Sequence, residues 1–367
     1  MKVNILVISN MHPGENHQFY GIYVKNFLDN FSESNVEVVS TSIIKGRGKN
    51  LLEKIIKYLK FYCSIISNLL FSKYDLVYVH YPSYASLPIL TCLPLINKPI
   101  VLNFHGTDIL GNNNVTKFMQ FLLKPLIAHA HSFIVPSIFF KEIVASKLFI
   151  EKEKIFVSPS GGIDTEEFKP FKEKTTRTLF QIGYVGRIDE GKGWEVLLKS
   201  CSILKDQIPN FKCFIAGNGD KVNDLRNSLN SLGITENVQF LGPLPHKELK
   251  DFYNELDIFI FPTLLQESLG LVGIEALSCG VPTIGSRIGG LKDYIIDDVN
   301  GYLFEPGNHI QLAEKILYLY ENKIELQKLK SNARKSVLSF DKRVVVDELS
   351  SKLERICLSK NLSSNND

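Results

Sequence analysis

Two glutamates, Glu267 and Glu275, enclose a short segment that follows the apolar run 257–262. The apolar run ends in proline and predicts a buried strand, while the glutamate segment predicts a helix that begins near Ser268 and is closed by Gly280. Glu275 then lies about two turns into the helix, and the carboxylates are separated by roughly 10 Å along its axis. The free N–H groups of a helix N-terminus lie between them and favour an anion. Two carboxylates around an anion site fit the sugar, diphosphate and ribose of a nucleotide sugar; the alternative is a capped surface helix with solvated acids.

A glycine-rich loop, Gly186-Arg-Ile-Asp-Glu-Gly-Lys-Gly193, follows another strand-like run. It nearly matches the phosphate-binding pattern of nucleotide triphosphatases, but Gly193 stands where that pattern needs a hydroxyl to bind magnesium. Its two cations, Arg187 and Lys192, can neutralise a diphosphate without a metal. We therefore favour a phosphate site over a surface turn with solvated charges, because the loop follows a strand.

His105 opens the segment His105-Gly-Thr-Asp108, directly after the predicted strand Ile100–Phe104. A side chain at the carboxyl end of a parallel strand points into the crevice where such folds bind ligands. The imidazole could donate to a sugar hydroxyl, or it could be a turn histidine held by Asp108.

Other glycines could bring the backbone close to a phosphate. Gly14 and Gly21 lie in the long loop after the first strand, which lacks the G-x-G-x-x-G fingerprint of nicotinamide dinucleotide binding. Gly217 opens a Gly-Asn-Gly turn after a strand, and such a turn taken alone is structural.

The elements that must position these residues alternate between strand-like and helix-like stretches, which predicts an α/β fold with parallel sheets. We expect two doubly wound Rossmann-like domains that face a central cleft, with a linker at Thr165–Thr176. The first domain spans 1–168 and is completed by a C-terminal helix at about 344–367; the second spans 174–343. The last helix should bury the stripe Val345, Leu349, Leu353 and Ile356.

Composition excludes several classes of protein. The chain has 367 residues and a net charge of +3, which is too small to predict nucleic-acid binding. Six scattered cysteines without metal-binding spacing indicate reduced thiols in a cytoplasmic protein. We expect neither a signal peptide nor a transmembrane helix. The basic, partly aromatic segment 45–62 predicts either peripheral contact with the inner face of the cell membrane or a core-facing helix with solvated lysines.

The assembled motifs resemble the family 4 retaining glycosyltransferases of the GT-B fold, in particular enzymes of bacterial cell-surface polysaccharides. The resemblance covers nearly the whole chain and is most specific in Glu267-x7-Glu275 together with Gly186-Arg187 and Lys192-Gly193. Two positions depart from the pattern: Tyr20-Gly21 replaces a Gly-Gly pair, and Asp293 replaces a glutamate. The first departure leaves the geometry of the acceptor-side loop open.

The resemblance implies a role for each candidate residue. Arg187 and Lys192 would bind the donor diphosphate. Glu267 would contact hydroxyls of the donor sugar, and Glu275 would hold the ribose. His105 would lie beside the transferred sugar. The nucleobase is expected near Gly242 and Leu244. The backbone N–H groups that would take the phosphate are those of Ser268, Leu269, Gly270 and Leu271.

The implied reaction moves a sugar from a nucleotide-diphosphate sugar to a hydroxyl of a glycan or lipid-linked glycan, with retention and with no metal or other cofactor. A uridine diphosphate sugar is favoured over a guanosine diphosphate sugar. Two alternatives stay open: a nucleotide-sugar epimerase of similar architecture, and a non-catalytic subunit of a polysaccharide assembly complex.

Overall fold

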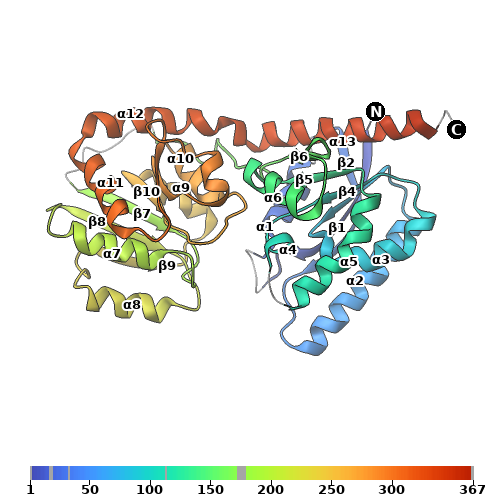
Figure 1. Cartoon of the computed structure of the whole chain (residues 1–367), viewed down its shortest axis with the longest axis horizontal. Helices are drawn as coiled ribbons and strands as arrows, with labels where there is room; N and C mark the ends of the chain where they lie inside the picture. Colours follow the sequence, from blue (N-terminus) through green and yellow to red (C-terminus); the bar gives the residue numbers. More distant parts are fainter. Residues whose placement is uncertain (1, 16–19, 32–33, 112–113, 172–178, 365–367) are drawn as a thin grey trace. The chain divides into compact units, whose positions relative to one another are not determined.

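The chain folds into two compact units in a computed structural model that describes residues 2–15, 20–31, 34–111, 114–171 and 179–364 (Figure 1). The first unit is made of Met1–Gly162 and Lys342–Asp367, and the second of Ile163–Asp341. The expected linker, Thr165–Thr176, lies partly outside the described residues. Its described part belongs to the second unit, because Phe168 is buried in the core of that unit.

The first unit is built on a sheet of six parallel strands in the order β2-β1-β3-β4-β5-β6. The strands are β1 (Val3–His12), β2 (Val36–Lys45), β3 (Leu76–His80), β4 (Ile100–Asn103), β5 (Ser132–Val135) and β6 (Ile155–Val157). All residues of β3, β4 and β5 are buried, as expected for a parallel sheet that is covered on both faces. The predicted strand Ile100–Phe104 is confirmed as β4, which ends at Asn103, and His12 still pairs with Lys45 at the ends of β1 and β2.

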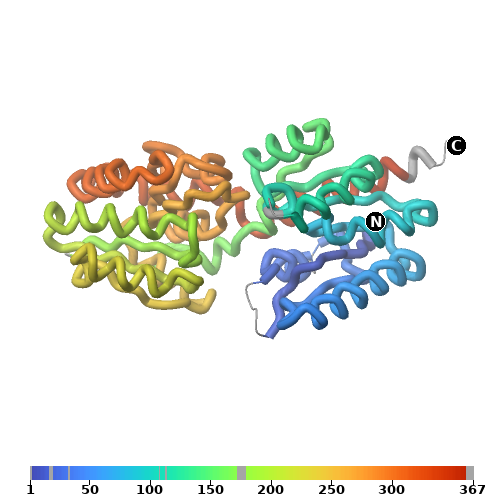
Figure 2. The backbone as a smooth tube through the Cα atoms, turned by 60° about the horizontal axis from the view of Figure 1, so that its bottom comes forward, coloured from blue at the N-terminus to red at the C-terminus, as the bar shows by residue number. Residues whose placement is uncertain are grey.

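Helices cover both faces of this sheet. On one face α2 (Leu51–Phe71), α3 (Ser86–Cys92), α5 (Asn114–His129) and α6 (Ile138–Leu148) bury apolar side chains. On the other face lie α1 (Ile22–Asn30) and the C-terminal helix α13 (Lys342–Ser364), and a short helix, α4 (Thr107–Leu110), follows β4. The predicted stripe of α13 is confirmed, since Leu349 and Leu353 are buried against β1 and β3. Figure 2 shows the end of this helix, in red, in the same unit as the blue N-terminal segments.

The second unit repeats the architecture, with strands in the order β12-β11-β10-β7-β8-β9. The strands are β7 (Phe180–Val185), β8 (Phe211–Ala216), β9 (Val238–Gly242), β10 (Ile258–Phe261), β11 (Thr283–Ser286) and β12 (Gly301–Phe304). The helices are α7 (Trp194–Leu204), α8 (Val222–Ser231), α9 (His246–Asn254), α10 (Leu271–Ser278), α11 (His309–Glu321) and α12 (Lys323–Ala333).

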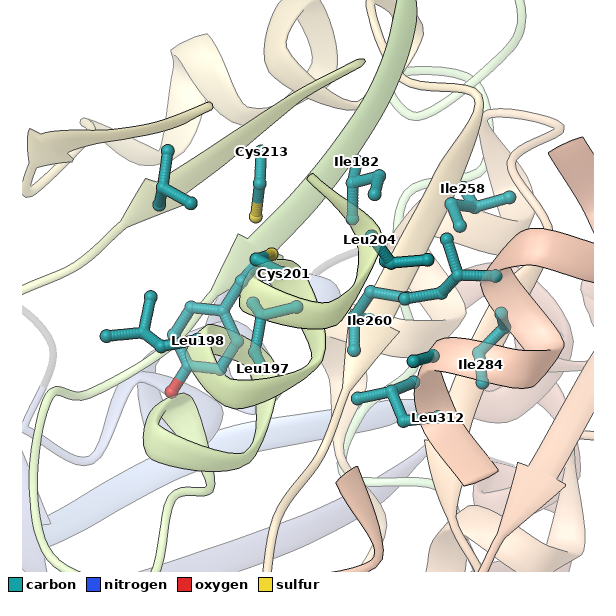
Figure 3. Packing of buried hydrophobic residues seen from close by; sticks show 14 of the residues in the cluster. Ile182, Leu197, Leu198, Cys201, Leu204, Cys213, Ile258, Ile260, Ile284 and Leu312 are labelled. Atoms are coloured by element: carbon teal, nitrogen blue, oxygen red, sulfur yellow. The ribbon is translucent and has the colours of Figure 1, made fainter. Parts of the chain in front are cut away.

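The core of the second unit lies between the sheet and its helices. Figure 3 shows Leu197 and Leu204 of α7 among side chains of neighbouring strands, including Ile182 of β7 and Ile260 of β10. The opposite face is covered by α9 and α10, which pack around Phe259. Among the described residues, no helix is both long and apolar enough to cross a membrane.

Candidate active site

The candidate site of the second unit lies where the strand order of its sheet reverses. The neighbouring parallel strands β7 and β10 both end there. The glycine loop Gly186–Gly193 continues from β7, and the loop that carries Glu267 continues from β10. Doubly wound sheets bind ligands at this point, outside the carboxyl ends of the strands. The fold thus brings together two motifs that are far apart in the sequence.

Lys192 and Glu267 form an ion pair at this point. The Nζ of Lys192 donates to Oε1 of Glu267 at 2.8 Å, and the hydroxyl of Thr263 donates to the same oxygen at 3.1 Å. The two charged side chains are only 25% and 19% exposed. We expected each group to hold a different part of a ligand; in the structure their opposite charges balance each other, away from most solvent.

The end of the glycine loop packs tightly against the end of β10. Gly193 has a φ of +76°, and a Cβ on it would lie 1.8 Å from the carbonyl oxygen of Pro262. A Cβ on Gly217, with a φ of +154°, would lie equally close to the carbonyl oxygen of Gly186. Contacts between the loops themselves therefore require glycine at these positions. The expected close approach of this backbone to a phosphate stays a prediction.

Arg187 extends from the glycine loop toward solvent. Its side chain is 65% exposed and forms an ion pair with Asp189. Asp189 also accepts from the backbone N–H of Asp220 at 2.9 Å, so it ties the glycine loop to the loop after β8. Asp189 was not predicted to belong to the site, although it stands within the quoted loop two residues after Arg187.

The helix that carries Glu275 begins later than predicted. The segment from Glu267 to Leu269 is held by the following loop, whose Gly290 N–H donates to the carbonyl of Glu267 at 2.8 Å. The chain then enters α10 through Gly270, which has a φ of +90° and precedes the first helical residue, Leu271. The predicted start near Ser268 is therefore wrong, and Glu275 lies about one turn into the helix instead of two.

Within the described part of the chain, no side chain caps the N-terminus of α10, so its first N–H groups are available to a ligand. Leu269 is buried just before the helix, whereas Ser268, Gly270 and Leu271 are half-buried. These backbone groups and the ammonium of Lys192 lie on segments that meet at the same edge of the sheet. Together they provide the partial and full positive charge that a diphosphate needs.

Glu275 is a buried carboxylate, 6% exposed, and α9 holds it in place. The hydroxyl of Tyr253 donates to its Oε2 at 3.0 Å, and Nε2 of His246 lies 3.6 Å from its Oε1. The hydrogen bond with Glu275 raises the pKa of His246, against the opposing effect of burial. Neither partner was predicted, because their link to Glu275 crosses from one helix to another.

The proposed nucleobase region lies on the loop before α9. Gly242 ends β9 with a φ of +75°, and a Cβ there would meet nothing within 4 Å. Leu244 is half-buried against the same apolar cluster that includes residues of α9 and α10. This loop therefore presents both an apolar side chain and open space.

In the first unit, His105 lies at the end of β4 within an aromatic cluster. The carboxylate of Asp108 accepts from the backbone N–H groups of His105 and Gly106, at 3.2 and 2.9 Å, so it holds the turn and leaves the imidazole to other partners. The ring of Tyr23 stacks on the imidazole with centroids 4.0 Å apart. Burial raises the pKa of Asp108 to about 7.

His80 is the partner that sequence reasoning missed. Its Nδ1 lies 2.9 Å from Nε2 of His105, so one of the two nitrogens carries the shared hydrogen. Burial lowers the pKa of His80 to about 3 and that of His105 well below its usual value. Both rings are therefore neutral near pH 7, and His105 is suited to hydrogen bonding.

The two glycines expected in the first loop are also explained by close packing. A Cβ on Gly21, which has a φ of +69° and precedes α1, would lie 2.6 Å from the backbone of Met11. A Cβ on Gly14 would lie 2.9 Å from the backbone of Gly46. Contacts within the chain therefore account for both residues, and a role in phosphate binding remains a proposal.

Comparison with known proteins finds a glycosyltransferase model that matches each half of the chain. The model described as "Glycosyltransferase Family 4" matches residues 22–167, and the model described as "Glycosyl transferases group 1" matches residues 165–336. The chain is 31% identical over 221 residues to the capsular polysaccharide biosynthesis glycosyltransferase CapM of Staphylococcus aureus, covering 57% of each chain. It is 30% identical over 210 residues to the amylovoran biosynthesis glycosyltransferase AmsK of Erwinia amylovora, covering 56% of this chain. The matches span 57% and 51% of the length of these two relatives.

Solved structures share the fold along nearly the whole chain. Sucrose-phosphate synthase from Thermosynechococcus elongatus superposes with a TM-score of 0.77 at 17% identity, covering 97% of this chain and 99% of that one. HepE from Anabaena, solved in complex with UDP-glucose, gives a TM-score of 0.74 at 17% identity and covers 96% of this chain and 99% of its own. With its two parallel six-stranded sheets and the matching sequence models, the chain belongs to glycosyltransferase family 4 and has the GT-B fold.

Proposed function

We propose that this protein transfers a sugar from a nucleoside-diphosphate sugar to a hydroxyl of a glycan or lipid-linked glycan, with retention at the anomeric carbon and without a metal ion. One observation carries the proposal: the ion pair between Lys192 and Glu267 lies at the edge of the sheet where α10 presents its uncapped N-terminus. A site with a cation, a carboxylate and free backbone N–H groups matches a donor that has both phosphates and sugar hydroxyls.

The donor is proposed to lie along the loops of the second unit. Lys192 and Arg187 would pair with its diphosphate, and the first N–H groups of α10 would donate hydrogen bonds to it. Its sugar hydroxyls would donate to Glu267. Its ribose hydroxyls would donate to Glu275, whose carboxylate Tyr253 already orients at 3.0 Å. The base would lie on the open loop at Gly242 and Leu244.

The proposed chemical step breaks the bond between the anomeric carbon and the phosphate oxygen and forms a bond between that carbon and the acceptor oxygen on the same face. The acceptor proton passes to the departing phosphate oxygen. Lys192, Arg187 and the backbone N–H groups stabilise the negative charge that develops on the phosphate. His105, neutral because burial lowers its pKa, is proposed to hydrogen-bond the transferred sugar.

The relatives support a donor and an acceptor class. HepE from Anabaena is solved with UDP and with UDP-glucose, which supports a uridine diphosphate sugar here. CapM and AmsK carry names of polysaccharide biosynthesis glycosyltransferases, which supports a glycan acceptor in a cell-surface polysaccharide pathway.

A thermal-shift panel of uridine, guanosine and adenosine diphosphate sugars identifies the donor, because a ligand that binds the native state raises its stability by mass action. The stabilising donor is then incubated with and without a glycan acceptor, in the presence and absence of a chelator. We expect a new glycoside with the donor's anomeric configuration, formed only with acceptor and insensitive to the chelator. Conversion of the donor to another nucleotide sugar without acceptor would instead indicate an epimerase, and absence of stabilisation by every donor would refute the proposed site.

A further inference from the structure

The imidazole of His105 is held by neighbouring rings on its face and at its edge. The ring of Tyr23 stacks on it with centroids 4.0 Å apart, and the ring of Tyr81 lies nearly parallel to it, at 5.6 Å and 10°. At its edge, Nε2 of His105 lies 2.9 Å from Nδ1 of His80. The two imidazoles meet edge to edge, since their centroids are 5.1 Å apart and their planes differ by 22°. Stacking thus fixes the plane of the His105 ring, and His80 fixes its rotation within that plane.

The backbone after β3 adopts a strained conformation where these rings meet. Tyr81, the residue after His80, has a φ of +54° and a ψ of +60°, in the left-handed region that residues other than glycine seldom adopt. Its N–H donates to the carbonyl of Asn103 at 3.1 Å, at the end of the strand that leads to His105. Such strain persists where the surrounding structure requires it, and it gathers at functional sites. The strained turn therefore joins the ends of β3 and β4, where the two histidines meet.

His80 itself has two nitrogens in different surroundings. Its side chain is 1% exposed, and among the described residues its Nε2 has no hydrogen-bond partner. The ring of Phe27 lies 4.6 Å away at 84°. On the other side of the ring, Nδ2 of Asn103 lies 3.4 Å from Nδ1 of His80 and donates to the hydroxyl of Tyr78 at 2.8 Å. His105, at 2.9 Å, is therefore the closer partner of Nδ1 of His80.

These contacts favour one tautomer of each ring. Both rings are neutral because burial lowers the pKa of each, so each carries a single N–H. A buried N–H without an acceptor is rarer in proteins than a buried acceptor without a donor. The hydrogen of His80 is therefore assigned to Nδ1, which donates it to Nε2 of His105. The hydrogen of His105 must then lie on its own Nδ1, the nitrogen that remains for a ligand.

We propose that His80 is a positioning residue that keeps His105 in the Nδ1–H tautomer, so that His105 presents a hydrogen-bond donor to the transferred sugar. The sugar contact rests on the proposed transfer reaction, whereas the tautomer is a property of the protein alone. An N–H donor bonds to a hydroxyl oxygen and leaves the hydroxyl hydrogen for another acceptor, while a bare ring nitrogen would take that hydrogen. His80 is buried and acts only through His105.

Nitrogen-15 NMR of the full chain, labelled at histidine and without donor or acceptor, measures the tautomer. Correlations between ring nitrogens and ring hydrogens distinguish Nδ1–H from Nε2–H, and the variant His105→Asn identifies the signals of His105. We expect Nδ1–H on His105 in the wild type and loss of this single tautomer in His80→Leu. His80→Asn, whose amide can donate from the place of Nδ1, should retain it. The matched control is His129→Leu, at an exposed histidine on α5 of the same unit, and it should behave like the wild type.

Transfer kinetics test the consequence for the reaction. His80→Leu should lower kcat/KM for the donor about tenfold, the effect of one lost hydrogen bond to the sugar, and His80→Asn should recover most of it. In the background of His105→Leu, where the partner is already absent, His80→Leu should cause no further loss. A purely structural role of His80 would lower kcat/KM in both backgrounds. Melting temperatures recorded in parallel report whether each variant folds.

Three results would overturn the proposal: Nε2–H on His105 in the wild type, an unchanged tautomer in folded His80→Leu, or an equal loss of kcat/KM in both backgrounds. The wild-type spectrum decides the tautomer even if His80→Leu does not fold. Absence of transfer by the wild type would refute the proposed function alone, because the NMR measurement needs no sugar.

Discussion

Replacement of Lys192 by alanine is the most direct perturbation of the proposed donor site. The substitution removes the ammonium that lies 2.8 Å from Glu267 and that we assign to the donor diphosphate. It leaves Glu267 with the hydroxyl of Thr263 as a remaining donor at 3.1 Å. The variant therefore loses the positive charge of Lys192, while the hydrogen bond from Thr263 still holds Glu267 and its loop in place.

Two magnitudes follow from this geometry. Folding should lose about 1 kcal/mol, because the pair is largely but not fully closed to solvent and Glu267 keeps one hydrogen bond. Catalysis should lose about 10²-fold or more in kcat, or roughly 2.7 kcal/mol, because the ammonium acts on charge that develops at the departing phosphate. The loss in activity is thus expected to exceed what the loss in stability explains.

The assay measures initial transfer rates at saturating donor, with the melting temperature of each variant recorded in parallel. Lys199→Ala on α7 is the matched control, since that lysine is exposed on the same unit and has no assigned role. Near wild-type kcat in Lys192→Ala at saturating donor would refute the assigned role. A cycle with Glu267→Gln should be strongly non-additive, because both changes break the same pair.

Three further results are expected. Gly193→Ala should destabilise the fold by about 3 kcal/mol or more in chemical denaturation, because its Cβ would overlap the backbone of Pro262. Gly242→Ala has a similar φ but open space around the Cβ, so it should lose only about 1 kcal/mol of stability. Equal losses in the two variants would contradict the packing argument. Tyr253→Phe should raise KM for the donor several-fold with little change in kcat, because Glu275 loses the hydroxyl that orients it, and an unchanged KM would argue against that role. The pKa of His246 is raised in the folded state, so this residue should stabilise the fold below pH 6.5 and lose the effect as the pH rises through its folded-state pKa. The melting temperatures of the wild type and of His246→Ala, measured across this pH range, should therefore converge at alkaline pH.

The parts of the fold that follow from local pattern could be predicted from the sequence. The run Ile258–Phe261 is apolar, short and followed by proline, and it forms the buried strand β10. The edge strand Gly301–Phe304 could not be predicted in this way, because a four-residue run that begins with glycine carries little strand signal. The start of α10 was misplaced because tertiary contacts of the Gly289-Gly290 loop, and not helix propensity, hold Glu267 to Leu269 outside the helix.

The candidate site was predictable in its motifs and not in its contacts. The cations of the glycine loop and the two glutamates could be chosen from residue type and position after a strand. The pairing of Lys192 with Glu267 could not, because it depends on which strands become neighbours in the sheet. The same holds for Tyr253 beside Glu275 and for His80 beside His105, where each partner lies on another element.

The first unit is assembled from two segments that the whole second unit separates in sequence, and this has a consequence for synthesis. During translation, Ile163–Asp341 emerges complete before Lys342 does. The face of the first sheet that α13 covers, including Val3, Ile5 and Val7, must wait for Leu349 and Leu353. We therefore expect the second unit to finish folding on the ribosome before the first, in reverse of the usual vectorial order. A nascent chain stalled before α13 would expose this apolar face to chaperones.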